Sequence, residues 1–249
     1  MRVSRAVAIN VAANTTLPGF RAPIYPDGTF QYVPIPEREP TDGDVPTYAE
    51  LGVPERLPFD VSGDIHDRPV HVDPEFAGSL GRDRYTYGDE HGVKAGPLST
   101  LEPDDRLYFY ATLSTYDPDE WSTQRVDWRP PAWGAYLIGV FVVAAVWTPS
   151  DEQQRDSTAE PPSWAATNAH AQRETFDAEV LIRGSEASRL FERAVPLSEP
   201  TGGADANDLV TTLSNDSGRG PWWRRVLRYD ETAADRLTTR VETAPTEWL

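Results

Sequence analysis

The pattern of apolar and polar positions is clearest in the middle of the chain. Residues 106–113 and 136–146 are almost continuously apolar, with many β-branched and aromatic side chains. Runs of this kind are typical of buried strands. Residues 2–11 alternate loosely between apolar and polar and predict an opening strand. Gly139 lies inside the second apolar run, where a glycine often marks a bulge or a barrel bend.

Turns, loops and short helices are predicted between and after these strands. Asp27-Gly28 separates two short strand-like pieces and predicts a turn. Residues 37–91 are rich in proline, glycine and acidic residues and show no helical or strand period, so we expect a long lid-like loop. Loops of this length in compact domains usually have a function. Short helices are expected at residues 186–193 and in a C-terminal segment at about 220–245.

Together these elements predict an α+β fold in a single domain spanning residues 1–249. The expected architecture is a mixed, mostly antiparallel β-barrel with short flanking helices. We expect the lid-like loop to fold over the barrel mouth and to close a pocket that contains Asp73 and Tyr87.

The charge composition changes this picture of an ordinary globular protein. There are 40 Asp and Glu residues against 23 Lys and Arg, the formal net charge is −17, and Lys94 is the only lysine. An acidic, lysine-poor chain is typical of proteins that work in molar salt, where the Debye length is about 3 Å and self-repulsion is screened. Acidity then argues less strongly against nucleic-acid binding, and a local arginine patch becomes more informative.

Several classes of protein are excluded by what the sequence lacks. The chain contains no cysteine, which excludes disulfides, thiolate catalysis and cysteine-based zinc sites. Its first residues are too polar for a signal peptide. Its longest apolar run, the eleven residues 137–147, is shorter than the roughly 20 that a membrane-spanning helix needs. We therefore expect a cytoplasmic protein with no membrane partner. Phosphate-loop, zinc-protease, serine-hydrolase and cytidine-deaminase motifs are also missing.

A set of short motifs resembles one protein family. The set consists of Ile9-Asn10, Asn14-Thr15 and residues 22–30, 33–37, 47–51, 71–76, 86–89, 168–170 and 188–191. In this order the motifs are similar to the third type of nucleotide modification associated domain, over residues 2–230. The strand pair described above also resembles PUA-like domains, the superfamily of the ASCH and EVE domains, although Asp104-Asp105 replaces their usual Gly-Asp.

This resemblance implies a function but no mechanism. The family is associated with DNA base modification systems of phages and prokaryotes, and the acidic composition points to a halophilic archaeon or its virus as the source. The resemblance implies nucleic acid as a partner, DNA in preference to RNA, or a modified nucleotide, together with other proteins of a modification system. It implies no cofactor, and it assigns a role to no single residue.

Two histidines and an aspartate are the candidates for acid–base chemistry. His71 and Asp73 stand at positions i and i+2, so on an extended segment their side chains face the same way. They form either a general acid–base pair, half of a metal site, or a hydrogen bond that holds the loop. No third metal ligand is visible, so no metal site is assigned. His170, with Asn168 before it, is equally open, because an asparagine either reads a base edge or caps a helix.

Residues for a base-binding pocket come from two other regions. Asn10 and Asn14 flank a loop after the first strand, where they either hold backbone groups or line a pocket beside Arg21. Tyr87, in the loop before Asp89, is the aromatic residue that we expect to stack on a base. The alternative for each of these side chains is a purely structural role in the loop or the core.

An arginine cluster near the C-terminus is the candidate for phosphate contact. Arg219, Arg224, Arg225 and Arg228 are interleaved with Trp222 and Trp223, and no acidic residue lies among them. Basic and aromatic side chains together are what a nucleic-acid backbone and its bases require. Alternatively the arginines pair with surface carboxylates while the tryptophans fill the core.

Three functions remain open from the sequence. The first is a module that recognises a modified base or nucleotide, and the second is an enzyme that transfers or removes a group on a DNA base with His71, Asp73 and His170. The third is a scaffold subunit without a pocket. Convergence of these three residues on one cavity favours the enzyme, whereas an aromatic-walled pocket without a paired acid and base favours the recognition module.

Overall fold

The computed structural model describes residues 4–42, 45–90, 92–118, 126–150, 153 and 159–247. Residues 2, 3, 43, 44 and 91 of the expected elements lie outside these ranges. The strands are β1 (Ala6–Asn10), β2 (Pro23–Ile24), β3 (Ile35–Pro36), β4 (Val70–His71), β5 (Thr86–Asp89), β6 (Arg106–Thr115), β7 (Trp133–Trp147), β8 (Val180–Gly184), β9 (Arg189–Pro196), β10 (Ser198–Glu199), β11 (Gly202–Ala206) and β12 (Leu227–Tyr229). The helices and 3-10 turns are η1 (Pro54–Arg56), α1 (Gly63–His66), α2 (Gly92–Ser99), η3 (Ser163–Ala165), η4 (Ala169–Gln172), α4 (Asp208–Thr211), η5 (Trp222–Arg224) and α5 (Glu231–Glu247).

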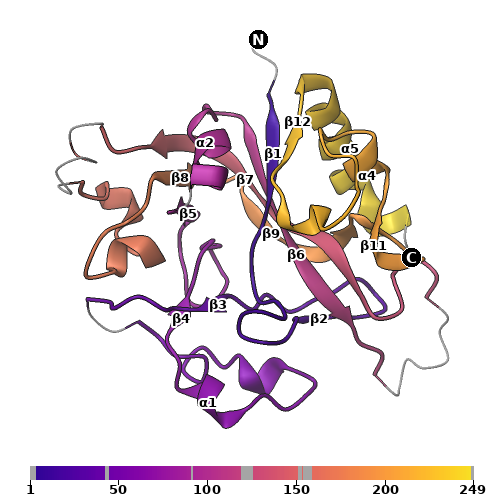
Figure 1. Cartoon of the computed structure of the whole chain (residues 1–249), viewed down its shortest axis with the longest axis horizontal. Coiled ribbons are helices and arrows are strands. Elements are labelled where there is room, and N and C mark those ends of the chain that lie inside the picture. The colour runs from indigo at the N-terminus through magenta and orange to yellow at the C-terminus, as the bar shows by residue number, and fades with distance from the viewer. Residues whose placement is uncertain are drawn as a thin grey trace.

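One eight-stranded sheet organises the fold (Figure 1). Its strands follow the order β12-β1-β6-β7-β8-β5, with β2 also paired to β6 and β9 also paired to β7. Strands β1 and β2 run parallel to β6, and the other pairs of this sheet are antiparallel. The mixed, mostly antiparallel arrangement is therefore confirmed. A closed barrel is not, because no pairing among the described residues joins the outer strands β12 and β5.

Strands β6 and β7 form the centre of the sheet, and both were predicted from their apolar runs. They pair from Arg106 opposite Val142 to Ser114 opposite Trp133, with a register shift after the pair of Phe109 and Gly139. A Cβ at Gly139 would lie 2.7 Å from the ring of Phe76, so the glycine allows close approach at this irregularity. Beyond β6, β7 pairs first with β9 and then with β8. One long strand is thus shared between two partners on the same edge.

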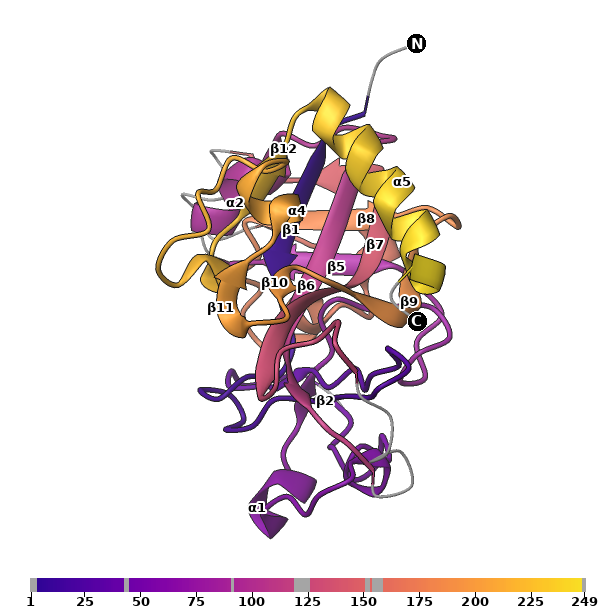
Figure 2. The same cartoon turned by 90° about the vertical axis from the view of Figure 1, so that its right-hand side faces the viewer.

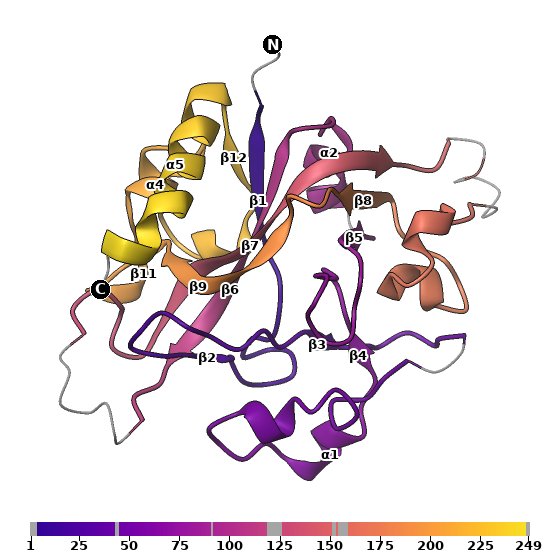
Figure 3. The ribbon, with the colours of Figure 1, turned by 180° about the vertical axis from the view of Figure 1, so that it is seen from behind.

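The two faces of the sheet carry separate cores, because successive side chains of a strand point in opposite directions. Ile9 and Phe109 belong to the core that the sheet shares with residues 37–90. Ala8, Tyr108 and Trp222 belong to the core on the other face, which α5 crosses (Figure 2). The C-terminal part of the chain and the 37–90 segment are thus separated by the sheet, as the reverse view also shows (Figure 3).

The expectation of a lid without regular structure at residues 37–91 is wrong, because η1, α1, β4 and β5 lie within this segment. β4 pairs with β3, and β5 joins the main sheet beside β8. Tyr48 anchors the segment, since its ring is fully buried and its hydroxyl donates to the carbonyl oxygen of Pro34 at 2.7 Å. The two strands are two and four residues long, which is too short for a period-2 pattern to stand out.

Two expected helices also need correction. Residues 189–196 form strand β9, not the helix expected at 186–193, because they pair with β7. In the C-terminal segment at 220–245, residues 220–229 contain a 3-10 turn and strand β12, and the helix α5 begins only at Glu231. None of the helices in the described part of the chain is long and apolar enough to cross a membrane.

Candidate functional site

A cavity of about 420 Å³ lies between the end of β1, the β3–β4 pair, β5 and η4. It is lined by residues from both predicted groups, the acid–base candidates and the base-pocket candidates. These are His71, Asp73 and His170 from the first group and Asn10, Asn14, Tyr87 and Asp89 from the second. Arg21 and Asn168 are not among its lining residues.

Short local structures bring His71, Asp73 and His170 together. His71 ends β4, and Asp73 follows it just before the backbone bridge between Glu75 and Thr86 on β5. His170 lies in η4, whose N-cap is Asn168. Asn168 is fully buried, accepts from the His170 N–H at 3.1 Å, and donates to Asp73 Oδ1 at 2.8 Å. The Asn168 side chain therefore caps η4 and also links this turn to Asp73 through a hydrogen bond.

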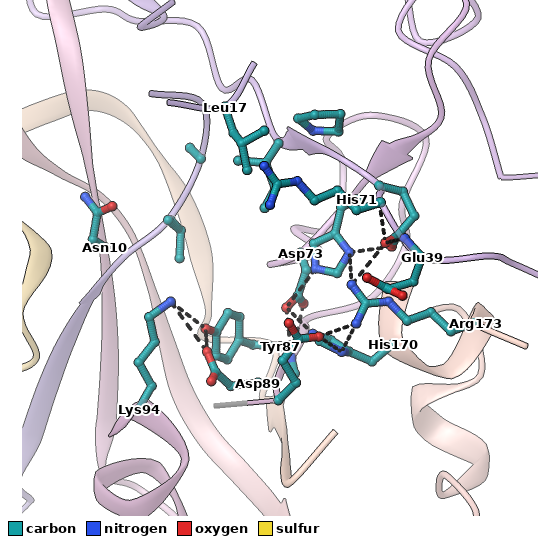
Figure 4. A pocket seen from close by; sticks show the side chains of 18 of the residues that line it. Asn10, Leu17, Glu39, His71, Asp73, Tyr87, Asp89, Lys94, His170 and Arg173 are labelled. Atoms are coloured by element: carbon teal, nitrogen blue, oxygen red, sulfur yellow. Dashed lines mark hydrogen bonds and ion pairs between the residues drawn. The ribbon is translucent and has the colours of Figure 1, made fainter. Parts of the chain in front are cut away.

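The three side chains converge on one wall of the cavity (Figure 4). Asp73 Oδ2 lies 4.0 Å from His71 Nε2 and 3.8 Å from His170 Nε2. The two imidazole rings are 5.0 Å apart and nearly perpendicular. The Gly88 N–H donates to both oxygens of Asp73, at 3.1 and 3.2 Å. All three side chains are buried, so their geometry is set by packing rather than by solvent.

A second layer of charged residues holds the two histidines from behind. His71 Nδ1 lies 2.6 Å from Glu37 Oε2, and His170 Nδ1 lies 2.8 Å from Asp177 Oδ1. Arg173 lies between them, 3.0 Å from Glu37 and in contact with both Asp177 and Glu90. Each imidazole therefore has its Nδ1 engaged by a carboxylate and its Nε2 directed at Asp73.

Burial and charge shift the titration of this cluster in opposite directions. Burial raises the pKa of Asp73 to about 7 and lowers that of His71. Burial would also lower the pKa of His170, but its hydrogen bond to Asp177 and the charge of Asp73 outweigh burial and raise it. Burial opposes ionisation of the two outer carboxylates as well. Their histidine partners nevertheless bring the pKa of Asp177 down to about 2 and that of Glu37 well below its ordinary value.

The opposite part of the cavity wall carries a second polar group. The Tyr87 hydroxyl donates to Asp89 Oδ2 at 2.6 Å, and Lys94 Nζ lies 3.4 Å from the same oxygen. The Tyr87 ring is only 3% exposed and packs against Phe109. In this arrangement the ring offers no open face to a base, because the structure places Tyr87 within β5 and not in the loop expected from the sequence.

The two asparagines near β1 differ in the hydrogen bonds that their side chains make. The Asn14 side chain accepts from the backbone N–H groups of Thr16 and Leu17 at 2.8 and 3.2 Å, which fixes the loop that contains it. Among the described residues, Asn10 Nδ2 makes one long contact, of 3.5 Å, to the Tyr110 carbonyl oxygen. Both line the cavity, and Asn10 is the one whose amide is less engaged by the protein itself.

The arginine candidates lie away from the cavity. The Arg21 guanidinium stacks over Trp133 at 4.3 Å, and Trp133 contacts Trp223. Trp222 is fully buried in the core on the other face of the sheet. Among the four clustered arginines, Arg225 pairs with Asp216 at 2.9 Å. Arg219, Arg224 and Arg228 are exposed. The structure thus separates the expected phosphate-contact surface from the expected pocket.

The residues behind the histidines, as well as Glu90 and Lys94 at the cavity, were not foreseen from the sequence. Glu37, Arg173 and Asp177 form the layer behind the histidines. Glu37 ends one of the motifs that carry the family resemblance, and Arg173 follows His170 by three positions. Asp177 lies in a polar stretch and has no distinguishing pattern. Only the fold brings the three to one place.

The cluster can act chemically in two ways. Two imidazole nitrogens and a carboxylate oxygen that lie within 4.8 Å of one another can exchange protons with a bound substrate or hold a metal ion. Glu90, His170 and Asp177 form a second group of the same kind, but the guanidinium of Arg173 already lies within it.

Comparison with known proteins gives one match. A family described as nucleotide modification associated domain 3 matches residues 5–241. No curated protein and no solved structure matches the chain.

Proposed function

We propose that this chain, which belongs to the nucleotide modification associated domain 3 family, is an enzyme of a nucleic-acid modification system. In this proposal the cavity takes up a nucleobase, either as a nucleotide or turned out of a strand. The reaction transfers or removes a group on that base, and His71, Asp73 and His170 form the reactive centre.

One observation carries the proposal. Both histidine Nε2 atoms lie within 4.0 Å of the same carboxylate oxygen of Asp73, on the wall of a cavity. A structural hydrogen bond would bring these atoms to about 3 Å. The three polar atoms instead surround a space that they do not fill, which is the arrangement expected where substrate or an activated species is held.

The size and the lining of the cavity suit a base. Its volume of about 420 Å³ falls in the range of small-molecule sites, roughly 300–1,000 Å³. Asn10 presents an amide that can pair with a base edge. Lys94 lies at the same cavity and supplies a positive charge within reach of a phosphate.

The recognition-module and scaffold alternatives have less support. A recognition pocket for a modified base would stack the base on an aromatic face, but the ring of Tyr87 is turned into the core. A scaffold would have no reason to keep two buried histidines and a buried aspartate around a shared space. Buried polar groups are costly unless they are satisfied or used.

The test is a mass measurement on nucleosides. Single- and double-stranded DNA, RNA and free nucleotides, each with and without modified bases, are incubated with the protein at about 2 M KCl. They are then digested and analysed by mass spectrometry. We expect one substrate class to change nucleoside mass with the wild type, and Asp73→Asn to lower the rate at least about 100-fold. His66→Gln is the control, because His66 is not among the lining residues of the cavity.

Two outcomes would contradict this function. If no substrate changes mass and the wild type binds a modified nucleotide, the protein is a recognition module. If Asp73→Asn converts substrate as fast as the wild type, the reactive centre lies elsewhere.

A further inference from the structure

We propose that His71, Asp73 and His170 form a site for one divalent transition-metal ion, held by the two Nε2 atoms and Asp73 Oδ2. The ion would lie on the cavity wall and face the space where the proposed function places the base, so the inference deepens that function and rests on it for the choice of substrate.

The spacing of the three atoms fits an ion better than it fits direct contact. Asp73 Oδ2 lies 4.0 and 3.8 Å from the two Nε2 atoms, too far for a hydrogen bond. Metal–nitrogen and metal–oxygen bonds of about 2.0–2.2 Å place neighbouring ligand atoms roughly 3.0–3.5 Å apart. Asp73 Oδ2 and each Nε2 must therefore approach by about 0.3–1 Å around an ion.

The outer carboxylates prepare both imidazoles for ligation. Each Nδ1 lies within hydrogen-bond distance of an ionised carboxylate, Glu37 for His71 and Asp177 for His170. An ionised carboxylate only accepts hydrogen bonds, so each Nδ1 carries a hydrogen and each Nε2 is the nitrogen left to bind a metal ion once it has released any proton. Arg173 also approaches the two Nδ1 atoms, at 3.3 and 3.4 Å, but these contacts are longer. A carboxylate behind each histidine is the usual support of a metal-binding imidazole.

The charges around the cavity leave room for a cation at this position. Glu90 and Asp177 already contact the guanidinium of Arg173, and Asp89 lies 3.4 Å from Lys94. Asp73 has no lysine or arginine within ion-pair distance among the described residues, and its oxygens accept only from the Gly88 N–H and the Asn168 amide. The only possible cationic partners of Asp73 among the described residues are the two imidazoles, when protonated. A buried carboxylate without a permanently charged partner is costly, and a bound divalent ion offsets that cost.

The chemistry of the ligands selects the class of metal. Two imidazoles and one carboxylate suit zinc, iron, cobalt and manganese, whereas magnesium and calcium prefer oxygen ligands throughout. Three protein ligands leave coordination positions open toward the cavity. An ion with open positions polarises a substrate oxygen or lowers the pKa of a bound water. When the site is loaded, the two histidines and Asp73 act as its ligands and do not exchange protons with substrate.

The experiment measures metal binding directly. The full chain is stripped with EDTA at molar KCl and titrated with Co²⁺, followed by visible absorption, and with Zn²⁺, followed by calorimetry. We expect one equivalent of each ion to bind. His71→Gln and His170→Gln should weaken binding more than 100-fold, and Glu37→Gln should weaken it about 10- to 100-fold by releasing the His71 ring. His66→Gln is the matched control and should bind as the wild type does.

Loss of metal binding is informative only in a variant that is folded. Circular dichroism and a thermal melt in EDTA identify any variant that fails to fold, and Asp73→Asn then replaces it. Failure of the folded wild type to bind one equivalent overturns the site, as does wild-type affinity in a folded His71, Asp73 or His170 variant. The nucleoside assay separates this inference from the proposed function. Conversion that persists in EDTA defeats the metal site alone, whereas tight metal binding without any conversion defeats the enzyme alone.

Discussion

Gly88 offers a sharp test of how the fold holds the site. It lies in β5, its N–H donates to Asp73, and its backbone angles are open to any residue. A Cβ at this position would lie 2.6 Å from His170 Cδ2, 3.0 Å from Asn168 Oδ1 and 3.1 Å from Leu181 Cδ2. Gly88→Ala therefore requires the His170 ring to move by roughly 0.8 Å to restore a contact of 3.4 Å, and the close packing around the buried ring resists that movement.

The magnitude follows from two opposing terms. Overpacking costs about 1–3 kcal/mol, and the loss of glycine freedom in the unfolded chain returns about 0.4–1 kcal/mol. We expect a net loss of about 1–2 kcal/mol and a fall in Tm of roughly 2–8 °C for a chain of this size. The displaced Nε2 should weaken Co²⁺ binding about 10- to 100-fold, as other losses of ligand support do.

The assay pairs a thermal melt with the Co²⁺ titration, and Gly96→Ala is the control. Gly96 lies in α2, and apart from its neighbours in the helix no atom comes within 4 Å of the added Cβ. Alanine there should therefore cause no overpacking and leave metal binding unchanged. A Gly88→Ala protein as stable as the wild type, with undiminished Co²⁺ affinity, would refute this account of the site.

Three further predictions follow from the composition and the second face of the sheet. The Tm should rise between about 0.1 M and 2 M KCl, and equal midpoints in a thermal melt would contradict adaptation to salt. Trp222→Ala should cost about 3–5 kcal/mol in urea unfolding because Trp222 is fully buried, whereas the same change at half-buried Trp223 should cost clearly less. If the exposed arginines contact phosphates, changing Arg219, Arg224 and Arg228 together to glutamine should lower the log–log salt slope of DNA binding by about 3. Arg225→Gln, already paired with Asp216, should change the slope little, and an unchanged slope in the triple variant would remove this surface from nucleic-acid contact.

The parts of the fold that were predictable are those where local pattern and tertiary environment agree. The apolar runs of β6 and β7 are long and continuous, as expected for strands that are buried on both faces of a sheet. β9 is different, because residues 186–193 have good helix formers and become a strand only through pairing with β7. The secondary structure of β9 is therefore set by tertiary contacts and not by local propensity.

The residues of the site also fall into those that local sequence could predict and those that only the fold brings together. The spacing of His71 and Asp73 placed two of its members together from the sequence, since a period of two is a local property. His170 joins them only because η4 packs on β5. Glu37 and Asp177 resemble ordinary surface acids in the sequence, and their pairing with the histidines depends on where distant segments meet. Tyr87 was misplaced for a related reason, because a four-residue edge strand looks like a loop.

Lys94 has a practical consequence for work on this protein. It carries the only lysine ε-amine of the chain, its side chain is 31% exposed, and it lies at the cavity beside Asp89. An amine-reactive fluorophore or crosslinker therefore modifies one lysine side chain, and that side chain lines the cavity. Labelling at this position would report on occupancy of the cavity without introducing a new residue, and protection from labelling would serve as a footprint for whatever binds there.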